Sequence, residues 1–277
     1  MPKKFIVANW KMLPTTLAEA QELLESVNEH LEMLGEQREF SLIFCPPFVF
    51  IEEVAKMLAA GHLKHMAELG AQDISPQDQG ALTGEVSGPM LSRLGVRYVI
   101  VGHSERRWKL GESDEVVNAK LKAALRNELV PIVCVGERTR DAGYENFLRE
   151  QTKKTFEGLS PDEVARCLIA YEPVWAISTT PDARPDTPEN ALESMNIIRD
   201  VLSSRFQLLG PLFLYGGSVT AENAEAFLAP RDINGVLVGG AMVLHLRAQG
   251  LAVQAHLADS NAELINAWRV VQREPLK

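Results

Sequence analysis

Residues 167–175 read CLIAYEPVW, a short apolar run that ends on a glutamate followed at once by a proline. The run is continuous rather than alternating in polarity, which is typical of a strand buried on both faces of a parallel sheet. Pro173 fixes the backbone where the chain leaves this strand. Similar runs recur along the chain, and we predict strands at 5–9, 41–45, 69–73, 98–102, 131–136, 167–172, 212–216 and 235–238.

Amphipathic helical patterns separate these runs, at 17–34, 49–60, 114–127, 144–158 and 187–206. Ser160-Pro161-Asp162-Glu163 is a capping box with proline at the first helical position, and Thr187-Pro188 is a second helix start. Strand–helix pairs repeated eight times predict an α/β protein built as a (β/α)8 barrel. A doubly wound open sheet competes with this interpretation, but it usually has fewer strands, and no GxGxxG turn follows the first strand.

No linker, low-complexity tract or change in composition divides the 277 residues, so we predict a single domain over 1–277. Residues 242–277 are more than one closing helix needs, and we expect a closing helix plus a C-terminal extension. Ser260-Asn261-Ala262-Glu263 is another capping box, and Leu264, Ile265, Trp268 and Val271 follow it at helical spacing. An extra C-terminal helix is therefore predicted.

The overall charge and the cysteines narrow the class of protein. A formal net charge of −9 argues against broad binding to nucleic acid or to anionic membranes. The three cysteines (Cys45, Cys134 and Cys167) lie inside apolar runs without CxxC spacing, as reduced core thiols do. The first apolar run is too short for a signal peptide, and no stretch has the length of a membrane span. We expect a cytoplasmic protein.

Three strand ends carry side chains suited to acid–base chemistry. Glu172 ends a buried strand, where partial desolvation favours a general base, although a lone glutamate there is more often structural. His103 ends another strand just before a helical segment, whose dipole favours the neutral imidazole; an isolated buried histidine is usually bonded to backbone. Lys11 follows the first strand and can stabilise negative charge, although most lysines are merely solvated.

Two glycine pairs, Gly216-Gly217 and Gly239-Gly240, each follow a late strand. Glycine lets backbone N–H groups approach a phosphate closely, and barrels often bind phosphate with the loops after their seventh and eighth strands. Either pair alone is a weak signal, because glycine pairs also occur in ordinary turns. Together they indicate a small phosphorylated ligand.

The sequence resembles the triosephosphate isomerase family from Phe5 to about Gly240. The resemblance rests on four motifs in the same order and context: NWK at 9–11, GHSERR at 102–107, YEPVWAI at 171–177 and YGGSV at 215–219. Further matches are AQD at 71–73, GALTGEV at 80–86 and VCVGE at 133–137. The resemblance implies a TIM barrel that interconverts dihydroxyacetone phosphate and D-glyceraldehyde 3-phosphate through an enediolate, as in glycolysis and gluconeogenesis. It implies no metal and no organic cofactor.

The same resemblance assigns roles to individual residues. It implies that Glu172 moves the proton between C1 and C2 and that His103 polarises the carbonyl and passes protons between the oxygens. It implies that Lys11 supplies positive charge, that Asn9 helps to position the substrate, and that Glu105 lies beside the lysine.

The phosphate site and the assembly follow from the resemblance as well. The implied phosphate-binding positions are Ser178, Ser218, Gly239 and Gly240. The segment Thr83-Gly84-Glu85 matches the loop that reaches into a partner subunit, which implies a homodimer.

The lid over the substrate departs from the family pattern. Family members usually continue from Trp-Ala-Ile into Gly-Thr-Gly, whereas this chain has Ser178-Thr179-Thr180 followed by a longer segment with Pro181 and Pro185. The chemical groups remain, so triose phosphate isomerisation is the leading hypothesis. The same chemistry on a larger phosphorylated ketose is an alternative, and a barrel that has lost catalysis is another.

Overall fold

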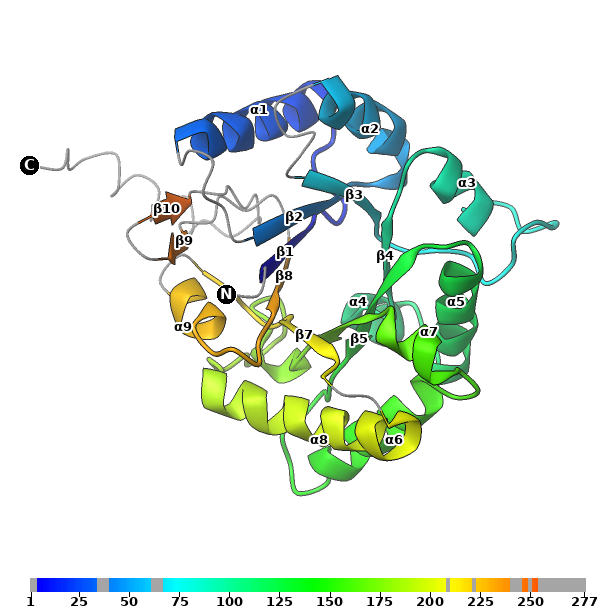
Figure 1. Ribbon diagram of the computed structural model, residues 1–277, viewed down its shortest axis with the longest axis vertical. Coiled ribbons are helices and arrows are strands. Elements are labelled where there is room, and N and C mark those ends of the chain that lie inside the picture. The colour runs from blue at the N-terminus through cyan, green and yellow to red at the C-terminus, as the bar shows by residue number, and fades with distance from the viewer. Residues whose placement is uncertain are drawn as a thin grey trace, which may run out of the picture.

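Eight parallel strands pair in chain order and close on themselves, with β1 bonded to both β2 and β8 (Figure 1). The computed structural model describes residues 4–33, 40–60, 67–207, 210–220, 223–239, 246–248 and 251–253. The strands are β1 Lys4–Asn9, β2 Phe40–Cys45, β3 Ala67–Ala71, β4 Tyr98–Val101, β5 Val130–Val135, β6 Leu168–Tyr171, β7 Leu212–Tyr215 and β8 Gly235–Gly239. The predicted barrel is confirmed.

Helices ring the outside of this barrel (Figure 1). The long ones are α1 Leu17–Met33, α2 Ile51–Ala60, α5 Asp114–Arg126, α6 Tyr144–Thr155 and α8 Pro188–Phe206. The short ones are α3 Gly88–Arg93, α4 Ser104–Lys109, α7 Pro161–Ala165 and α9 Ala224–Leu228, and single 3-10 turns occupy Phe48–Phe50 (η1) and Val174–Ala176 (η3). The capping box at Ser160 and the cap at Thr187 are confirmed. The helical segment expected just after His103 is α4, whereas α3 and α9 were not predicted, because five or six residues are too few to show a helical period.

Both faces of the strands are buried, which explains their continuous apolar sequence. Alternate residues such as Val7 and Ile100 fill the barrel, while Ile6 and Val99 on the opposite faces pack beneath the helices. The three cysteines are free and buried, as expected of core thiols.

Beyond β8 the structure describes only two short antiparallel strands, β9 Leu246–Ala248 and β10 Leu251–Val253. The rest of 242–277 lies outside the described residues, so the closing helix, the extra C-terminal helix and the single domain over 1–277 stay predictions. No helix in the described part of the chain is long and apolar enough to cross a membrane.

Candidate active site

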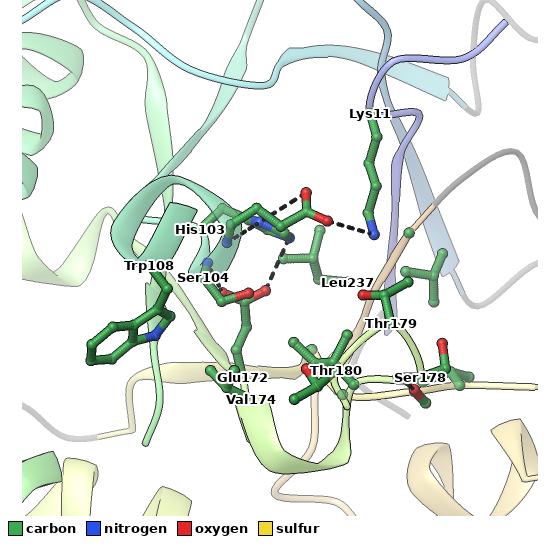
Figure 2. Close-up of a pocket in the computed structure, with 18 of the residues that line it drawn as sticks. Lys11, His103, Ser104, Trp108, Glu172, Val174, Ser178, Thr179, Thr180 and Leu237 are labelled. Carbon is green, nitrogen blue, oxygen red and sulfur yellow. Dashed lines mark hydrogen bonds and ion pairs between the residues drawn. The ribbon is translucent and has the colours of Figure 1, made fainter. Parts of the chain in front are cut away.

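A pocket of about 280 Å³ opens where the strands end at their carboxyl termini (Figure 2). The segments that follow β1, β4, β5, β6 and β7 contribute to its wall, together with the last residues of β8 itself. The candidate residues in this wall are Lys11, His103, Glu105, Glu172, Ser178, Ser218 and Gly239. Residues that lie up to 228 positions apart in the sequence are therefore brought together, as a parallel barrel requires.

Glu172 lies at the bottom of this pocket, directly after β6, with 2% of its surface exposed. Its Oε2 accepts a hydrogen bond from the backbone N–H of Ser104 at 2.8 Å, and its Oε1 lies 3.1 Å from Nε2 of His103. Gly216 makes room for this side chain, because a Cβ there would stand 2.8 Å from Cγ of Glu172. The carboxylate is thus held at the N-terminus of α4.

His103 is the N-cap residue of α4, and 8% of its surface is exposed. Its Nδ1 accepts a hydrogen bond from the backbone N–H of Glu105 at 3.3 Å, so this nitrogen carries no proton. The proton of a neutral imidazole then sits on Nε2 and points at Glu172.

Lys11 projects from the first strand end into the pocket with a left-handed backbone (φ 54°). Its N–H donates to Oδ1 of the buried Asn9 at 3.1 Å, and its carbonyl accepts from Gln72 at 2.9 Å, which supports this unusual conformation. A side chain at Gly239 would approach Cε of Lys11 to 2.7 Å, so only glycine leaves the lysine its place. Asn9 therefore holds the backbone of Lys11, and Gly239 leaves space for the end of its side chain, so that both help to set the position of the ammonium group.

Glu105 is the partner of this ammonium group, with Oε1 3.2 Å from Nζ of Lys11 (Figure 2). Burial acts to raise the pKa of Glu105, but the Lys11 ammonium, together with His103 and Lys109, holds it below the usual value. Glu105 is therefore a carboxylate at neutral pH, and it keeps a positive charge pointed into the pocket.

The opposite end of the pocket is built from the segments after β6 and β7 and from the last residue of β8. The backbone N–H of Ser178 donates to Oγ of Ser218 at 2.7 Å, and both residues line the pocket with Gly239. Gly240 lies outside the described residues. Ser178 and Thr180 do not adopt positive φ, so the loss of the family glycines leaves no strain there; the left-handed residue of this segment is Asp182, with φ 59°.

The segment at 174–186 is tied to the barrel by a few contacts that sequence reasoning missed. Glu137 receives two hydrogen bonds on Oε1, from Nε1 of Trp175 and from the hydroxyl of Tyr171, each at 2.8 Å. Burial raises the pKa of Glu137 despite these donors. At the other end of the segment, Asp186 is hydrogen-bonded to Tyr215. The motif VCVGE contains Glu137 but does not reveal its partners.

Arg107 is a second residue whose role the sequence did not disclose. It is the last residue of the GHSERR motif, it lies on α4 and it is buried. Its guanidinium donates to the carbonyls of Gly102 and Cys134 at 2.7 and 3.1 Å and pairs with Asp114 at 2.7 Å. It therefore fixes the helix that presents His103 and the N–H of Ser104.

The segment Thr83-Gly84-Glu85 is exposed in the single chain, and Gly84 has φ 92°. This position fits a protruding loop. Among the described residues, no group of three or more His, Cys, Asp or Glu side chains is arranged to hold a metal ion.

The pocket of this closed (β/α)8 barrel contains a carboxylate, an imidazole and an ammonium group. These are the groups that an enzyme uses for acid–base catalysis. The family model described as triosephosphate isomerase matches residues 4–251. Triosephosphate isomerase from Roseiflexus castenholzii is 41% identical over 244 residues, which covers 87% of this chain and 93% of that protein. The enzyme from Chloroflexus aurantiacus is 45% identical over 242 residues, with coverage of 85% and 92%.

A solved structure agrees. The crystal structure of triosephosphate isomerase from Bartonella henselae matches with a TM-score of 0.72 and 32% identity, and the match covers 86% of this chain and 93% of that one. This chain belongs to the triosephosphate isomerase family, and it is an isomerase. The resemblance seen in the motifs is confirmed.

Proposed function

We propose that this pocket is where the chain interconverts dihydroxyacetone phosphate and D-glyceraldehyde 3-phosphate, the reaction of its family, with Glu172 as the base. The observation that carries the proposal is the pairing of Glu172 with His103 at 3.1 Å within the pocket. Lys11 stands at the same pocket as a source of positive charge.

In this mechanism Glu172 removes a proton from the carbon next to the carbonyl. The electrons of that C–H bond form the carbon–carbon double bond of an enediolate, and the carbonyl electron pair moves onto oxygen. His103 donates its Nε2 proton to that oxygen and recovers a proton from the neighbouring hydroxyl, while Lys11 stabilises the developing negative charge. Glu172 then returns its proton to the adjacent carbon.

Both present hydrogen bonds of Glu172 must open when substrate binds. The bond from the N–H of Ser104 opens so that the carboxylate can reach the substrate carbon, and the bond from His103 opens so that Nε2 can donate its proton to the substrate oxygen. Asn9 positions the substrate with Lys11, and Glu105 keeps the lysine oriented.

The phosphate binds at the other end, to Ser178, Ser218, Gly239 and Gly240. The N–H of Ser178 and the hydroxyl of Ser218 are now bonded to each other at 2.7 Å. A phosphate oxygen can replace this contact by accepting from both groups. Substrate binding is therefore expected to break the hydrogen bond between Ser178 and Ser218 and to form two new hydrogen bonds to the phosphate.

The test is Glu172→Asp, which withdraws the carboxylate by one methylene. We expect kcat to fall by about 10²-fold or more with an unchanged unfolding temperature. Near-normal activity of this variant would refute the assignment. Lys11→Ala should lower both turnover and affinity, and His103→Gln should lower turnover alone. Activity should survive dialysis against a chelator, because Lys11 meets the charge of the enediolate.

We also propose a cytoplasmic homodimer in which Thr83-Gly84-Glu85 enters the partner's surface. Exposed apolar side chains on the loops after the first three strands support this, notably Met12 (90% exposed) and Val49 (81%). Light scattering of the purified protein should give twice the chain mass, and Val49→Asp should shift it towards the monomer. A fully active wild-type monomer would contradict the proposal.

A further inference from the structure

The pocket extends beyond the reacting groups to a rim formed by Trp108, Lys109 and Arg138. Figure 2 shows Trp108 on the far side of Glu172 from Ser178. A triose phosphate with its phosphate at Ser178 and its reacting carbons at Glu172 therefore leaves this rim unused. Two of the three rim residues are cations, although the chain as a whole has a formal net charge of −9.

The rim has a defined geometry. Trp108 stacks on Phe147, with ring centroids 6.3 Å apart and an interplanar angle of 27°. The guanidinium of Arg138 lies 5.6 Å from the centroid of the Trp108 ring, which restricts where this exposed side chain can point. The indole thus serves as a platform that holds a guanidinium at the mouth of the pocket.

Neither cation of the rim is neutralised closely by the protein. Within the described part of the chain, no carboxylate lies at ion-pair distance from Arg138. Lys109 lies 3.8 Å from Oε1 of Glu105, an oxygen that Lys11 already approaches to 3.2 Å. Lys109 is also 67% exposed, so this distant pair contributes little. Both groups remain open to an anion from solution.

We propose that Lys109 and Arg138 form a rim subsite for the second phosphate of a bisphosphorylated sugar, which competes with triose phosphate and is not turned over. The inference rests on the proposed function, because it places the first phosphate at Ser178 and Ser218. The planar guanidinium matches two phosphate oxygens, and the ammonium of Lys109 adds a point charge at the same rim. A ligand with one phosphate gains nothing from the rim, whereas one with a phosphate at each end can contact both ends of the pocket.

The experiment compares two ligands of equal chain length, D-ribulose 5-phosphate and D-ribulose 1,5-bisphosphate. Their dissociation constants are measured by calorimetry and their inhibition constants against triose phosphate. We expect the bisphosphate to bind about five- to tenfold more tightly, a gain discounted for the exposure of the rim. The double variant Lys109→Gln with Arg138→Gln should bring this ratio close to one.

The matched control is Lys153→Gln, which removes an exposed charge on α6 outside the pocket. It should leave the ratio unchanged and keep kcat/KM for triose phosphate within about twofold of the wild type. An equal weakening of both ligands in the double variant would mean that the rim acts only as a general field, and it would overturn the subsite. An unchanged ratio, or no binding of either ligand, would overturn it too. A wild-type protein without isomerase activity would instead refute the proposed function, since calorimetry tests the rim independently.

Discussion

Helix α4 and the segment at 174–186 stand on two sides of Glu172, but they are anchored in different ways. Helix α4 is fixed by buried Arg107, which contacts the ends of β4 and β5 and the start of α5. The facing segment is largely exposed and depends on isolated bonds, such as that from the N–H of Ser178 to Ser218. That exposed bond can be exchanged for one to water or to a ligand.

This difference separates two functions of the site, which are to hold the reacting groups and to bind and release the phosphate. Groups that must hold a reacting geometry lie on the buried side, where opening requires several bonds to break together. Groups that must admit and release a phosphate lie on the side where single bonds open at low cost. The changed sequence at 178–186 falls entirely on the second side, so it leaves the position of Glu172 and His103 untouched.

Removal of Arg107 should have the largest effect, and it tests whether the buried anchoring of α4 holds the reacting groups in place. Arg107→Met leaves Asp114 and two backbone carbonyls without their donor, and we expect stability to fall by about 3–5 kcal/mol. Because α4 carries His103, kcat should fall by about 10²-fold, while the KM for triose phosphate stays nearly constant. Urea unfolding and steady-state kinetics measure the two effects.

Arg107→Lys is the conservative partner of this variant. It keeps one charge near Asp114 but loses the fork that reaches both carbonyls, so kcat and stability should lie between those of the wild type and Arg107→Met. If Arg107→Met raised KM and left kcat intact, α4 would not be a positioning element.

The barrel could be predicted because its strands are buried on both faces and so carry continuous apolar runs. The candidate residues could be found because Lys11, His103 and Glu172 each follow such a run closely. The anchoring of α4 could not be predicted, since the partners of Arg107 lie 27 residues away at Cys134 and 48 away at Thr155. No periodicity encodes contacts of that kind.

The lid shows a second limit of sequence reasoning. The sequence drew attention to Ser178 and Thr180, which replace glycines, yet the left-handed residue of the segment is Asp182. A longer segment shifts the turn along the chain, and only the backbone path shows where the turn falls. The contacts of Glu137 and Asp186 depend on the same path.

A change in the lid, the segment at 174–186, should have a smaller effect, and it tests whether this exposed segment acts on binding and release. The double substitution Ser178→Gly with Thr180→Gly adds backbone freedom. The expected free-energy change is about 0.4–1 kcal/mol for each residue, which is about a two- to fivefold change in an equilibrium constant. We expect kcat and KM to change together by such factors, because the lid takes part in both binding and release. Stopped-flow kinetics with a phosphate-bearing inhibitor measure closure directly.

Asp182→Gly is the matched control for the lid variant. It places glycine where φ is already positive, so it relieves strain in the present conformation. We expect a small gain in stability from it. A fall in kcat as large as that of Arg107→Met, in either lid variant, would show that the lid positions the reacting groups.

The smallest expected effect concerns pH and the anchor of the lid at Glu137, which is 1% exposed. Burial raises the pKa of Glu137 above that of an unfolded glutamate, so the folded state binds this proton more tightly. Its contribution to stability is complete below the unfolded pKa and is lost as pH rises through the folded pKa, which lies above the usual range of a glutamate. Glu137→Gln keeps an acceptor for Trp175 and Tyr171 but cannot ionise, so its free energy of unfolding, relative to the wild type, should increase from mildly acidic to neutral pH. The free energy of unfolding of both proteins is measured by urea unfolding at each pH. If the two curves of free energy against pH were parallel, the buried carboxyl of Glu137 would have an ordinary pKa and its ionisation would not destabilise the fold.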